Sequence, residues 1–495
     1  MNEIAQAIGR IPMIGALAPL CSIMVAAVVS LMIVAFKKGK ALAAEPYIAI
    51  AGLLAAISVA WFAWPAASAG GSPALLTDRL ALAGIEIICA AAICAVLISR
   101  PYLAVHGEGR GGFYGLVLLS VFGMSALAFA GDLIAILIAM EAMSVSLFAL
   151  TGFMRDRPQS VEGSLKFFMM SAFATAFYCM GLAFIFGSLG STSLATIAQR
   201  FDYVASGEGR SVFLFGIAMV FSGLALKVAA VPFHAWAPDA LDGAPTPASL
   251  LICTSARAAA LIAFLRLASA VAAPGGELWH GMAAAISAAT ILWGALAAMR
   301  QESIKRMLSY LSIAGGGLML AVLPSLAQAG SMMTRALLFN LIAYSISMAG
   351  AFAALVALGL GPGEPLDQRH LCGLSRTRPW SAAALSLFLL SLAGLPPTLG
   401  FTGRFYLIMA VAKAGDVALA AVAAAGSAIM LACVLRPVSA MYFREPSQQA
   451  RPHATTGLAG SSLLIAVMLA CALAVIAFGI FPQNLLAFVY ASSPL

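Results

Sequence analysis

One lysine lies in an apolar stretch of the sequence shortly before a proline. The stretch begins at Ser211, carries Lys227 and meets Pro232 five residues after the lysine. A lysine in hydrocarbon costs about 3 kcal/mol, and a proline interrupts helical hydrogen bonds and frees backbone carbonyls. A broken transmembrane helix beside a titratable group is typical of ion and proton carriers. The alternative is a kinked structural helix whose lysine reaches the membrane interface.

Three more titratable residues lie in or beside apolar stretches. Glu141 is deep in one, where a Glu–Lys pair that opens and closes would switch lysine protonation; a static ion pair is the alternative. Lys166 is close to the end of another, so reaching the interface competes with a role in transfer. His234 follows Pro232 and is either a proton relay or a structural histidine. We predict that proton translocation uses Glu141, Lys166, Lys227 and His234.

Two arginines, Arg257 and Arg404, also lie inside apolar stretches. Arginine does not release its proton in proteins, so neither residue can load protons as a lysine can. Both are predicted to act as fixed charges that tune Lys227 or gate a water-filled path. Static pairing is the alternative.

Four other charged residues receive structural predictions. Asp132 and Glu86 lie at or inside the ends of apolar stretches and are predicted to be interfacial or helix-pairing groups. Arg436 and Arg266 are predicted to anchor helix ends or to bind lipid and partner subunits.

The composition places all of these residues in an integral membrane protein. Of 495 residues, 62% are hydrophobic and 9% are charged, whereas soluble domains contain about 25% charged residues. The 45 glycines and 23 prolines suit membrane helices with breaks. The net charge of +8 does not indicate nucleic-acid binding, because no basic patch carries interleaved aromatic residues.

The cysteines do not indicate a metal centre. Eight are scattered through the chain without a CxxC pair, so neither a zinc site nor an iron–sulfur site is predicted. The first apolar stretch lacks a basic leader and a clear cleavage site, and we interpret it as a first helix rather than a removed signal peptide.

Fourteen apolar stretches are long enough to cross about 30 Å of hydrocarbon. They lie near residues 12–36, 45–64, 80–99, 112–130, 132–152, 161–188, 211–231, 245–270, 278–299, 303–323, 333–358, 380–411 (interrupted), 416–442 and 458–480. No loop between them is long enough for a soluble domain, so we predict an all-α integral membrane fold.

The orientation follows from lysine and arginine in alternate loops. The side of the N-terminus carries seven and the opposite side carries fifteen. Cytoplasmic loops are enriched in these residues, so both termini are predicted to be periplasmic.

A second break interrupts the twelfth stretch. Residues 391–406 contain Gly394, Pro396, Pro397, Gly400 and Gly403. The breaks lie in stretches seven and twelve, and an offset of five helices places them in opposite orientations, as in inverted repeats. The predicted regions are 1–111 (helices 1–3), 112–271 (first repeat, helices 4–8), 272–443 (second repeat, helices 9–13) and 444–495 (helix 14).

The segment LKVAAVPFHAWAPDALDGAPTP (226–247) resembles the signature of the antiporter-like membrane subunits of complex I. That group includes Mrp-type Na⁺/H⁺ antiporter and membrane hydrogenase subunits. Four further segments are similar to subunit N of NADH-quinone oxidoreductase: EAMSVSLFALTGFMR (141–155), SVEGSLKFF (160–168), QESIKRMLSYLSIA (301–314) and SLAGLPPTLGFTGRF (391–405). The resemblance covers most of the chain from the fourth to the thirteenth stretch.

The resemblance implies fourteen helices with two inverted five-helix units and a hydrophilic axis of Glu, Lys and His along the membrane. Glu141, Lys166 and Lys227 match positions of that axis. Arg257 and Arg404 stand where the family has lysines, and Gly315 stands where it often has a histidine.

The implied function is proton translocation across a bacterial inner membrane, driven by quinone reduction in partner subunits. The chain itself would bind no NADH, flavin, quinone, metal or iron–sulfur cluster. Its expected partners are other membrane subunits of complex I and the lipid bilayer, and no nucleic acid. The alternatives are an Mrp-like cation/proton antiporter subunit and a non-pumping structural paralogue.

Overall fold

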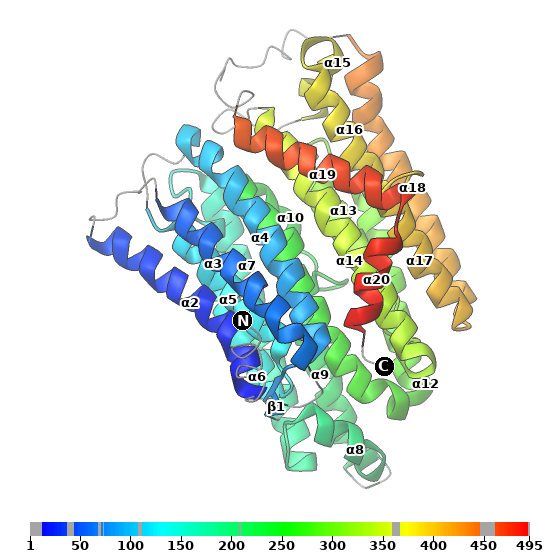
Figure 1. Ribbon diagram of the computed structural model, residues 1–495. Coiled ribbons are helices and arrows are strands. Elements are labelled where there is room, and N and C mark those ends of the chain that lie inside the picture. The colour runs from blue at the N-terminus through cyan, green and yellow to red at the C-terminus, as the bar shows by residue number, and fades with distance from the viewer. Residues whose placement is uncertain are drawn as a thin grey trace.

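A computed structural model of the chain shows a bundle of helices (Figure 1). It describes residues 12–36, 44–67, 71–72, 74–106, 111–205, 207, 209–358, 367–445 and 461–493. Within these residues, eleven helices are long and apolar enough to cross a membrane, and two shorter apolar helices accompany them. The predicted all-α membrane fold is confirmed, whereas the number fourteen is not established by helix length alone.

The first five described helices come before the group that contains the first break. They are α2 (Pro12–Phe36), α3 (Glu45–Ala63), α4 (Arg79–His106), α5 (Phe113–Phe129) and α6 (Leu133–Thr151). A short helix η1 (Trp64–Ala66) and a two-stranded hairpin, β1 (Gly71–Ser72) and β2 (Leu75–Leu76), join α3 to α4. α4 packs against both α3 and α5, and most of its apolar segment is buried inside the bundle.

The first break lies within the next group of helices. α7 (Pro158–Leu189) and α8 (Leu194–Ala205) lead to α9 (Arg210–Val228), which stops, and the chain continues as α10 (Trp236–Gly243) and α11 (Thr246–Leu251). A π-helical turn, η2 (Ile252–Ala256), joins α11 to α12 (Arg257–Met299). α12 spans two of the predicted stretches and is kinked at Gly276.

The second break lies in the remaining helices. α13 (Ile304–Leu320) and α14 (Leu326–Ala357) are followed by the short η3 (Gln368–Leu371) and α15 (Leu374–Thr377). α16 (Pro379–Ala393) and α17 (Leu399–Lys413) are the two halves of the broken helix. α18 (Val417–Phe443), α19 (Ser462–Ile480) and α20 (Gln483–Ser492) complete the described chain.

The connections lie at two ends of the bundle. The β1–β2 hairpin and α8 lie at one end, and α15 lies at the other (Figure 1). At the hairpin end, the amide of Gly131 donates to Ala74 and the amide of Leu194 donates to Gly131. These bonds join the segments before α4, α6 and α8, so loops far apart in the sequence fix one end of three helices.

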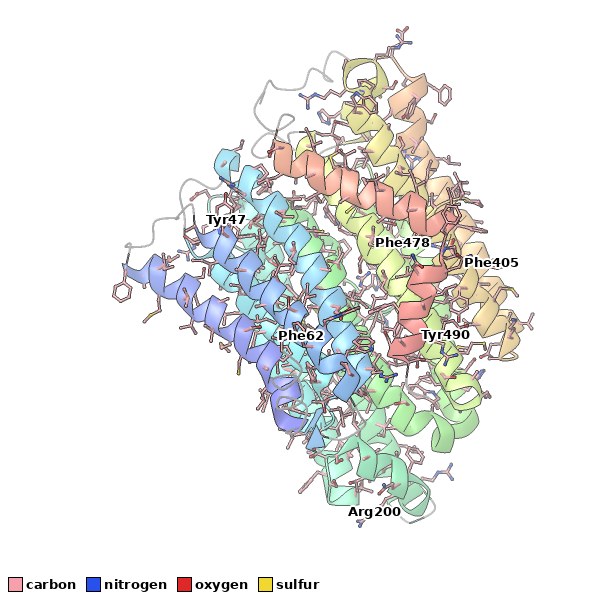
Figure 2. The ribbon with its side chains drawn as sticks, in the orientation of Figure 1. Tyr47, Phe62, Arg200, Phe405, Phe478 and Tyr490 are labelled. Atoms are coloured by element: carbon pink, nitrogen blue, oxygen red, sulfur yellow. The ribbon has the colours of Figure 1, made fainter. Side chains whose placement is uncertain are left out.

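Small residues allow the helices of the broken units to pack closely. A methyl group on Gly181 of α7 would lie 2.6 Å from the carbonyl oxygen of Gly216 on α9, which is less than contact distance. Such small-residue contacts are the usual means of helix association where lipid removes the hydrophobic driving force. The outer surface is apolar, and Phe62 and Phe405 are among the exposed aromatic side chains (Figure 2).

Some features were not predicted from the sequence. The amphipathic α8, the π-helical turn before Arg257 and the short C-terminal α20 lie outside the predicted stretches or inside one that was expected to be regular. Part of the basis for the orientation lies outside the described residues, namely Arg10, Lys37, Lys38, Lys40, Arg110 and Arg451.

Candidate functional site: two broken helices with buried cations

The first break begins at the C-terminal end of α9. Ala229 has φ +60° and ends the helix, and Pro232 follows with a cis peptide bond from Val231. The indole of Trp236 donates to the carbonyl of Leu226 at 3.0 Å. The amide of Val231 donates to the hydroxyl of Thr290 at 3.0 Å. Polar groups freed by the break are therefore bonded to the start of α10 and to α12.

Lys227 lies in the last turn of α9, directly before this break. Its side chain is only 2% exposed. The ammonium donates to Ser144 Oγ of α6 at 2.6 Å and to Ser171 Oγ of α7. A cation in the last turn is favoured by the partial negative charge at the helix C-terminus. Because a hydroxyl both donates and accepts, these serines can bond the lysine in either protonation state.

Glu141 of α6 is the nearest carboxylate to Lys227. Its Oε1 lies 3.8 Å from Lys227 Nζ, and the same oxygen accepts a 2.5 Å hydrogen bond from Thr175 Oγ1 of α7. The separation from the lysine is that of an ion pair without a direct hydrogen bond. The Glu141 side chain is 37% exposed, so one partner of the pair is buried and the other is reachable from outside the chain.

Lys166 lies in a separate cluster near the start of α7. Its ammonium is 2.6 Å from Glu162 and 2.7 Å from Asp239 of α10. Arg306 of α13 approaches the second oxygen of Asp239 at 2.9 Å. Asp239 therefore joins α7 to α13 through α10. The partial exposure of Lys166 agrees with its position near the N-terminal end of the helix.

Lys305 is one of the fifteen basic residues counted in loops on the side opposite the N-terminus, and in the structure it is buried. Its ammonium donates to the carbonyl oxygens of Asp242, at 2.9 Å, and Ala244 at the end of α10. Ser303, which caps α13, donates to the Asp242 carboxylate at 3.3 Å. In the described part of the chain, Lys305 is thus a third lysine with defined polar partners, after Lys227 and Lys166. Its burial was not foreseen from the sequence, because it stands next to Arg306 at the start of a helix.

His234 lies inside the break but apart from the two clusters. Its ring is 5.6 Å from the ring of Trp293, and its Nδ1 is buried without a hydrogen-bond partner. Among the described residues, no hydrogen bond or ion pair joins His234 to Lys227, Glu141 or Lys166.

The second break repeats the first in outline. α16 ends at Gly394, which has φ +82°, and the bond between Pro396 and Pro397 is cis. Arg404 reaches back from α17 and donates to the carbonyls of Ala393, at 2.7 Å, and Leu392. A methyl group on Gly394 would lie 2.8 Å from Arg404 Cδ. Glycine is therefore required here both by the left-handed backbone and by the approach of the arginine.

Arg257 lies between the two breaks, at the first residue of α12. Its guanidinium donates to the carbonyl of Ser312 and lies 5.9 Å from the ring of Tyr344, while its Nε has no partner. Neither Arg257 nor Arg404 has a carboxylate within ion-pair distance in the described part of the chain.

A small cavity adjoins Arg404 and Tyr344. Its volume of about 10 Å³ is close to that needed for one water molecule. The polar groups around it are Asn340, Ser347 and Ser391, and the two serine hydroxyls are 2.8 Å apart. This half of the molecule therefore places a buried cation beside hydroxyl groups, as the first half does.

The four other charged residues differ in their agreement with prediction. Arg266 donates to both oxygens of Asp78, at 2.9 and 2.6 Å, so its guanidinium is used within the chain rather than left for lipid or a partner. Asp132 caps α6 at Ile134 and accepts from Thr192. Arg436 donates to the carbonyl of Met299, the last residue of α12.

Glu86 differs from Asp132. Its Oε1 is buried and has no hydrogen-bond partner in the described structure. An interfacial or helix-pairing role for Glu86 stays a prediction.

The geometry unites some of the predicted residues and separates others. Lys227 and Glu141 form one site, Lys166 forms another with Asp239, and His234, Arg257 and Arg404 each have their own surroundings. Sequence reasoning missed Ser144, Ser171, Thr175 and Lys305 as partners. Only their positions in the bundle distinguish these three hydroxyl residues from the many that bond to their own helix. No group of three or more potential metal ligands occurs among the residues described.

The family is established by sequence comparison. A family model for the NADH:quinone oxidoreductase/Mrp antiporter transmembrane region matches residues 130–430, and the chain belongs to this family. Within the family, it is 37% identical over 423 residues to subunit N 1 of NADH-quinone oxidoreductase from Sorangium cellulosum, with 83% of this chain and 82% of that protein covered.

Solved structures agree with this assignment. A chain of respiratory complex I from Thermus thermophilus, solved with bound aureothin, has a TM-score of 0.78 and 30% identity, covering 96% of this chain and all of that one. A chain of the Mrp complex from Dietzia has a TM-score of 0.80 at 21% identity, covering 96% of both chains, which shows a shared fold.

Proposed function

We propose that this chain is the N-type membrane subunit of a proton-translocating NADH-quinone oxidoreductase in a bacterial inner membrane. Its relatives named as subunit N and its likeness to a complex I chain support this assignment. The observation that carries the transport function is the buried Lys227, held by two hydroxyls beside a helix break and 3.8 Å from Glu141.

In this proposal Lys227 is the proton-loading group of the first half. Approach of Glu141 stabilises the ammonium, and withdrawal of Glu141 favours release of its proton. Ser144 and Ser171 keep the nitrogen bonded through both states, because each hydroxyl can turn from acceptor to donor. The break frees the end of α9 from a continuous helical ladder, which gives the lysine a second position to move toward.

Lys166 and His234 have supporting roles in the same proposal. Lys166, bonded to Glu162 and Asp239, lies near the N-terminal end of α7, where protons would be exchanged with solvent. His234 would relay protons across the break, using the unpartnered Nδ1. Pro232 in the first break and Pro396 and Pro397 in the second supply the interruptions that this arrangement needs.

Arg257 and Arg404 are proposed to tune or gate the path. Each keeps its charge and is satisfied mainly by backbone carbonyls. A fixed charge in the second half raises the free energy of any proton passing it, unless water or a moving carboxylate offsets the charge. The second half would then respond electrostatically without loading a proton on a side chain.

The full topology is part of the proposal. Fourteen crossings result if α5, α13 and the broken pair α16–α17 are counted with the eleven long helices. The two breaks then belong to inverted five-helix units, residues 112–271 and 272–443, and both termini lie on the periplasmic side. The hairpin and α8 at one end of the bundle and α15 at the other agree with this alternation (Figure 1).

Redox chemistry is assigned to partner subunits. In this proposal NADH and quinone are used by the whole complex, and this chain contributes no redox centre and binds neither metal nor cofactor. Its partners are other membrane subunits and lipid. The likeness to chains of multi-subunit membrane complexes supports membrane partners.

Two other functions remain open to test. An Mrp-like antiporter subunit is favoured by the fold shared with the Mrp complex, and a non-pumping paralogue by the two arginines. The proteins that co-purify with the chain separate the first from our proposal, because only the oxidoreductase reading requires NADH-oxidising partners.

The decisive variant is Lys227→Ala. Removing a positioned proton donor and acceptor typically lowers the rate of proton transfer by at least about hundredfold. The rate of proton pumping should therefore fall by that factor while the complex still assembles. The measurement is dye quenching in inverted vesicles together with NADH oxidation. Lys413→Ala, which removes an exposed lysine at the end of α17, is the matched control. An unchanged ratio of protons pumped to NADH oxidised in Lys227→Ala would show that the assigned role is wrong.

A further inference from the structure

We propose that a cavity between α4, α14, α19 and α20 binds a neutral amphiphile from the bilayer that carries a hydroxyl group. The cavity has a volume of about 320 Å³, within the range of sites for small molecules. It lies on helices that do not carry Lys227, Glu141 or the two breaks, so the site is additional to the proposed proton path.

The lining is apolar apart from a few groups. Its polar side chains are Glu86, Ser345 and the thiols Cys94 and Cys471. The rest is aliphatic or aromatic, including Ile342 and Phe488. Such a lining accepts a hydrocarbon chain and a single small polar head, because any larger polar group would lose its hydrogen bonds with water.

Two polar atoms at this cavity lack partners. Glu86 Oε1 and Ser345 Oγ are both buried without a hydrogen bond in the described structure. Ser345 is 6% exposed. By contrast, Ser347, two residues further on α14, bonds to the carbonyl of Ala343 in its own helix. Buried polar groups are almost always bonded, so two such atoms at one cavity point to a missing partner.

The chemistry of these atoms defines the ligand. A carboxylate oxygen accepts a hydrogen bond, and a serine hydroxyl can donate one. Rotation of the two side chains toward the cavity would let a ligand hydroxyl donate to Glu86 and accept from Ser345. A cationic head is disfavoured, because the apolar lining would strip its water and offers only one carboxyl in return.

The cavity is accessible from the surface of the chain. Cys94, Ile342, Leu485 and Phe488 line it and are each partly exposed. Trp64 packs on Phe488 with ring centroids 5.6 Å apart, so an aromatic pair stands beside the opening. A lipid-soluble molecule can therefore reach Glu86 without crossing the protein core.

The test is photolabelling of the intact complex in native membrane vesicles. The probe is hexadecanol that carries a diazirine in its chain, and the control probe is the hexadecyl methyl ether with the same diazirine. Peptides containing Glu86–Cys94 and Leu485–Phe488 should be labelled about fivefold more by the alcohol than by the ether. One added hydrogen bond, worth about 1 kcal/mol, gives a factor of this size. Equal labelling by alcohol and ether would overturn the proposal.

Variants test the two unpartnered atoms separately. Glu86→Leu should reduce the preference for the alcohol over the ether toward equality, and Glu86→Gln, which keeps an acceptor oxygen, should retain most of it. Ser345→Ala removes the donor to an oxygen that both probes carry, so it should weaken labelling by both probes and leave the preference in place. Ser386→Ala is the matched control, because that buried serine bonds to its own helix on α16. A preference that persists in Glu86→Leu would contradict the assignment of that residue.

Competition in the unmodified protein does not depend on the folding of any variant. Unlabelled hexadecanol should reduce labelling at least about fivefold more effectively than hexadecyl methyl ether or hexadecane, for the same reason. If hexadecylamine competes better than the alcohol, the site selects a cation and the neutral ligand is ruled out. Proton pumping is recorded in parallel, because the labelling result does not depend on whether the chain pumps.

Discussion

The two helix breaks end alike but hold their cations differently. α9 ends at a left-handed residue, Ala229, and α16 ends at another, Gly394. In the first break the cation is Lys227, from the last turn of the helix that ends. In the second it is Arg404, which reaches back from α17 to the carbonyls of α16. Both arrangements put positive charge where a helix C-terminus has partial negative charge.

This difference separates a structural need from a functional one. A positive charge of either residue type is favoured at the C-terminal end of a broken helix, although only Arg404 donates to the freed carbonyls themselves. Only the lysine can release its proton, and among the residues that the structure describes only the lysine has a carboxylate beside it, Glu141 at 3.8 Å. The first break therefore combines both properties, whereas the second keeps the stabilising charge without the titratable group.

The largest effect on this comparison is expected from Glu141→Gln. The change leaves the first break with a cation and no carboxylate, as in the second break. An ion pair at this separation is worth about 2 kcal/mol once the exposure of Glu141 is allowed for, which corresponds to about thirtyfold. Proton pumping in vesicles should fall by about that factor at an unchanged amount of assembled complex.

The control for Glu141→Gln is Glu162→Gln. Glu162 is an exposed acid on α7, and its partner Lys166 keeps Asp239 when Glu162 is neutralised. Pumping in this variant should stay within about twofold of the original, as expected for an exposed pair. Equal losses in the two variants would show that the position beside Lys227 has no special role.

The membrane fold and both breaks were predictable because their signals are local. Hydropathy marks the apolar stretches, and proline and glycine mark the interruptions at Pro232 and at Gly394–Pro397. The charges within apolar stretches were visible for the same reason. A single sequence does not show which helices pack side by side. Ser144 and Ser171 resemble any serines in helices, and only the packing of α6, α7 and α9 brings them to Lys227.

One error and one unforeseen feature have a common physical cause. Lys305 was counted with the loops because it lies between a helix cap and Arg306, yet the end of α10 covers it. The cavity beside Glu86 was not foreseen from the sequence. In both cases the surroundings depend on segments distant in sequence. The same limit hid the π-helical turn before Arg257, since no residue type specifies it.

Arg404→Lys would make the second break resemble the first. An ammonium retains the charge but cannot span both carbonyls, so the free energy of unfolding should fall by about 1.5 kcal/mol, the value of one charged hydrogen bond. If the missing titratable group limits this half, the ratio of protons pumped to NADH oxidised should rise, and more so when Arg257→Lys is added.

The matched control for this change is Arg266→Lys. Arg266 is also buried, but it is bonded to Asp78 outside both breaks. This variant should lose stability without any change in the proton ratio. A ratio that stays constant in the double variant as well would mean that the two arginines do not limit transport.

The smallest effect is expected from Thr175→Val, which alters the position of Glu141 without changing any charge. The Thr175 hydroxyl donates to Glu141 Oε1 at 2.5 Å, and this is the same oxygen that faces Lys227. Loss of one hydrogen bond of about 1 kcal/mol should let the carboxylate move and reduce pumping about fivefold. Thr334→Val is the matched control, because that threonine bonds only to the Gly330 carbonyl of its own helix.

Combined with Glu141→Gln, Thr175→Val should have little further effect, since both changes act on one carboxylate. Additive losses would show instead that Thr175 acts on the path independently of Glu141, and that the first break depends on more than its Lys–Glu pair.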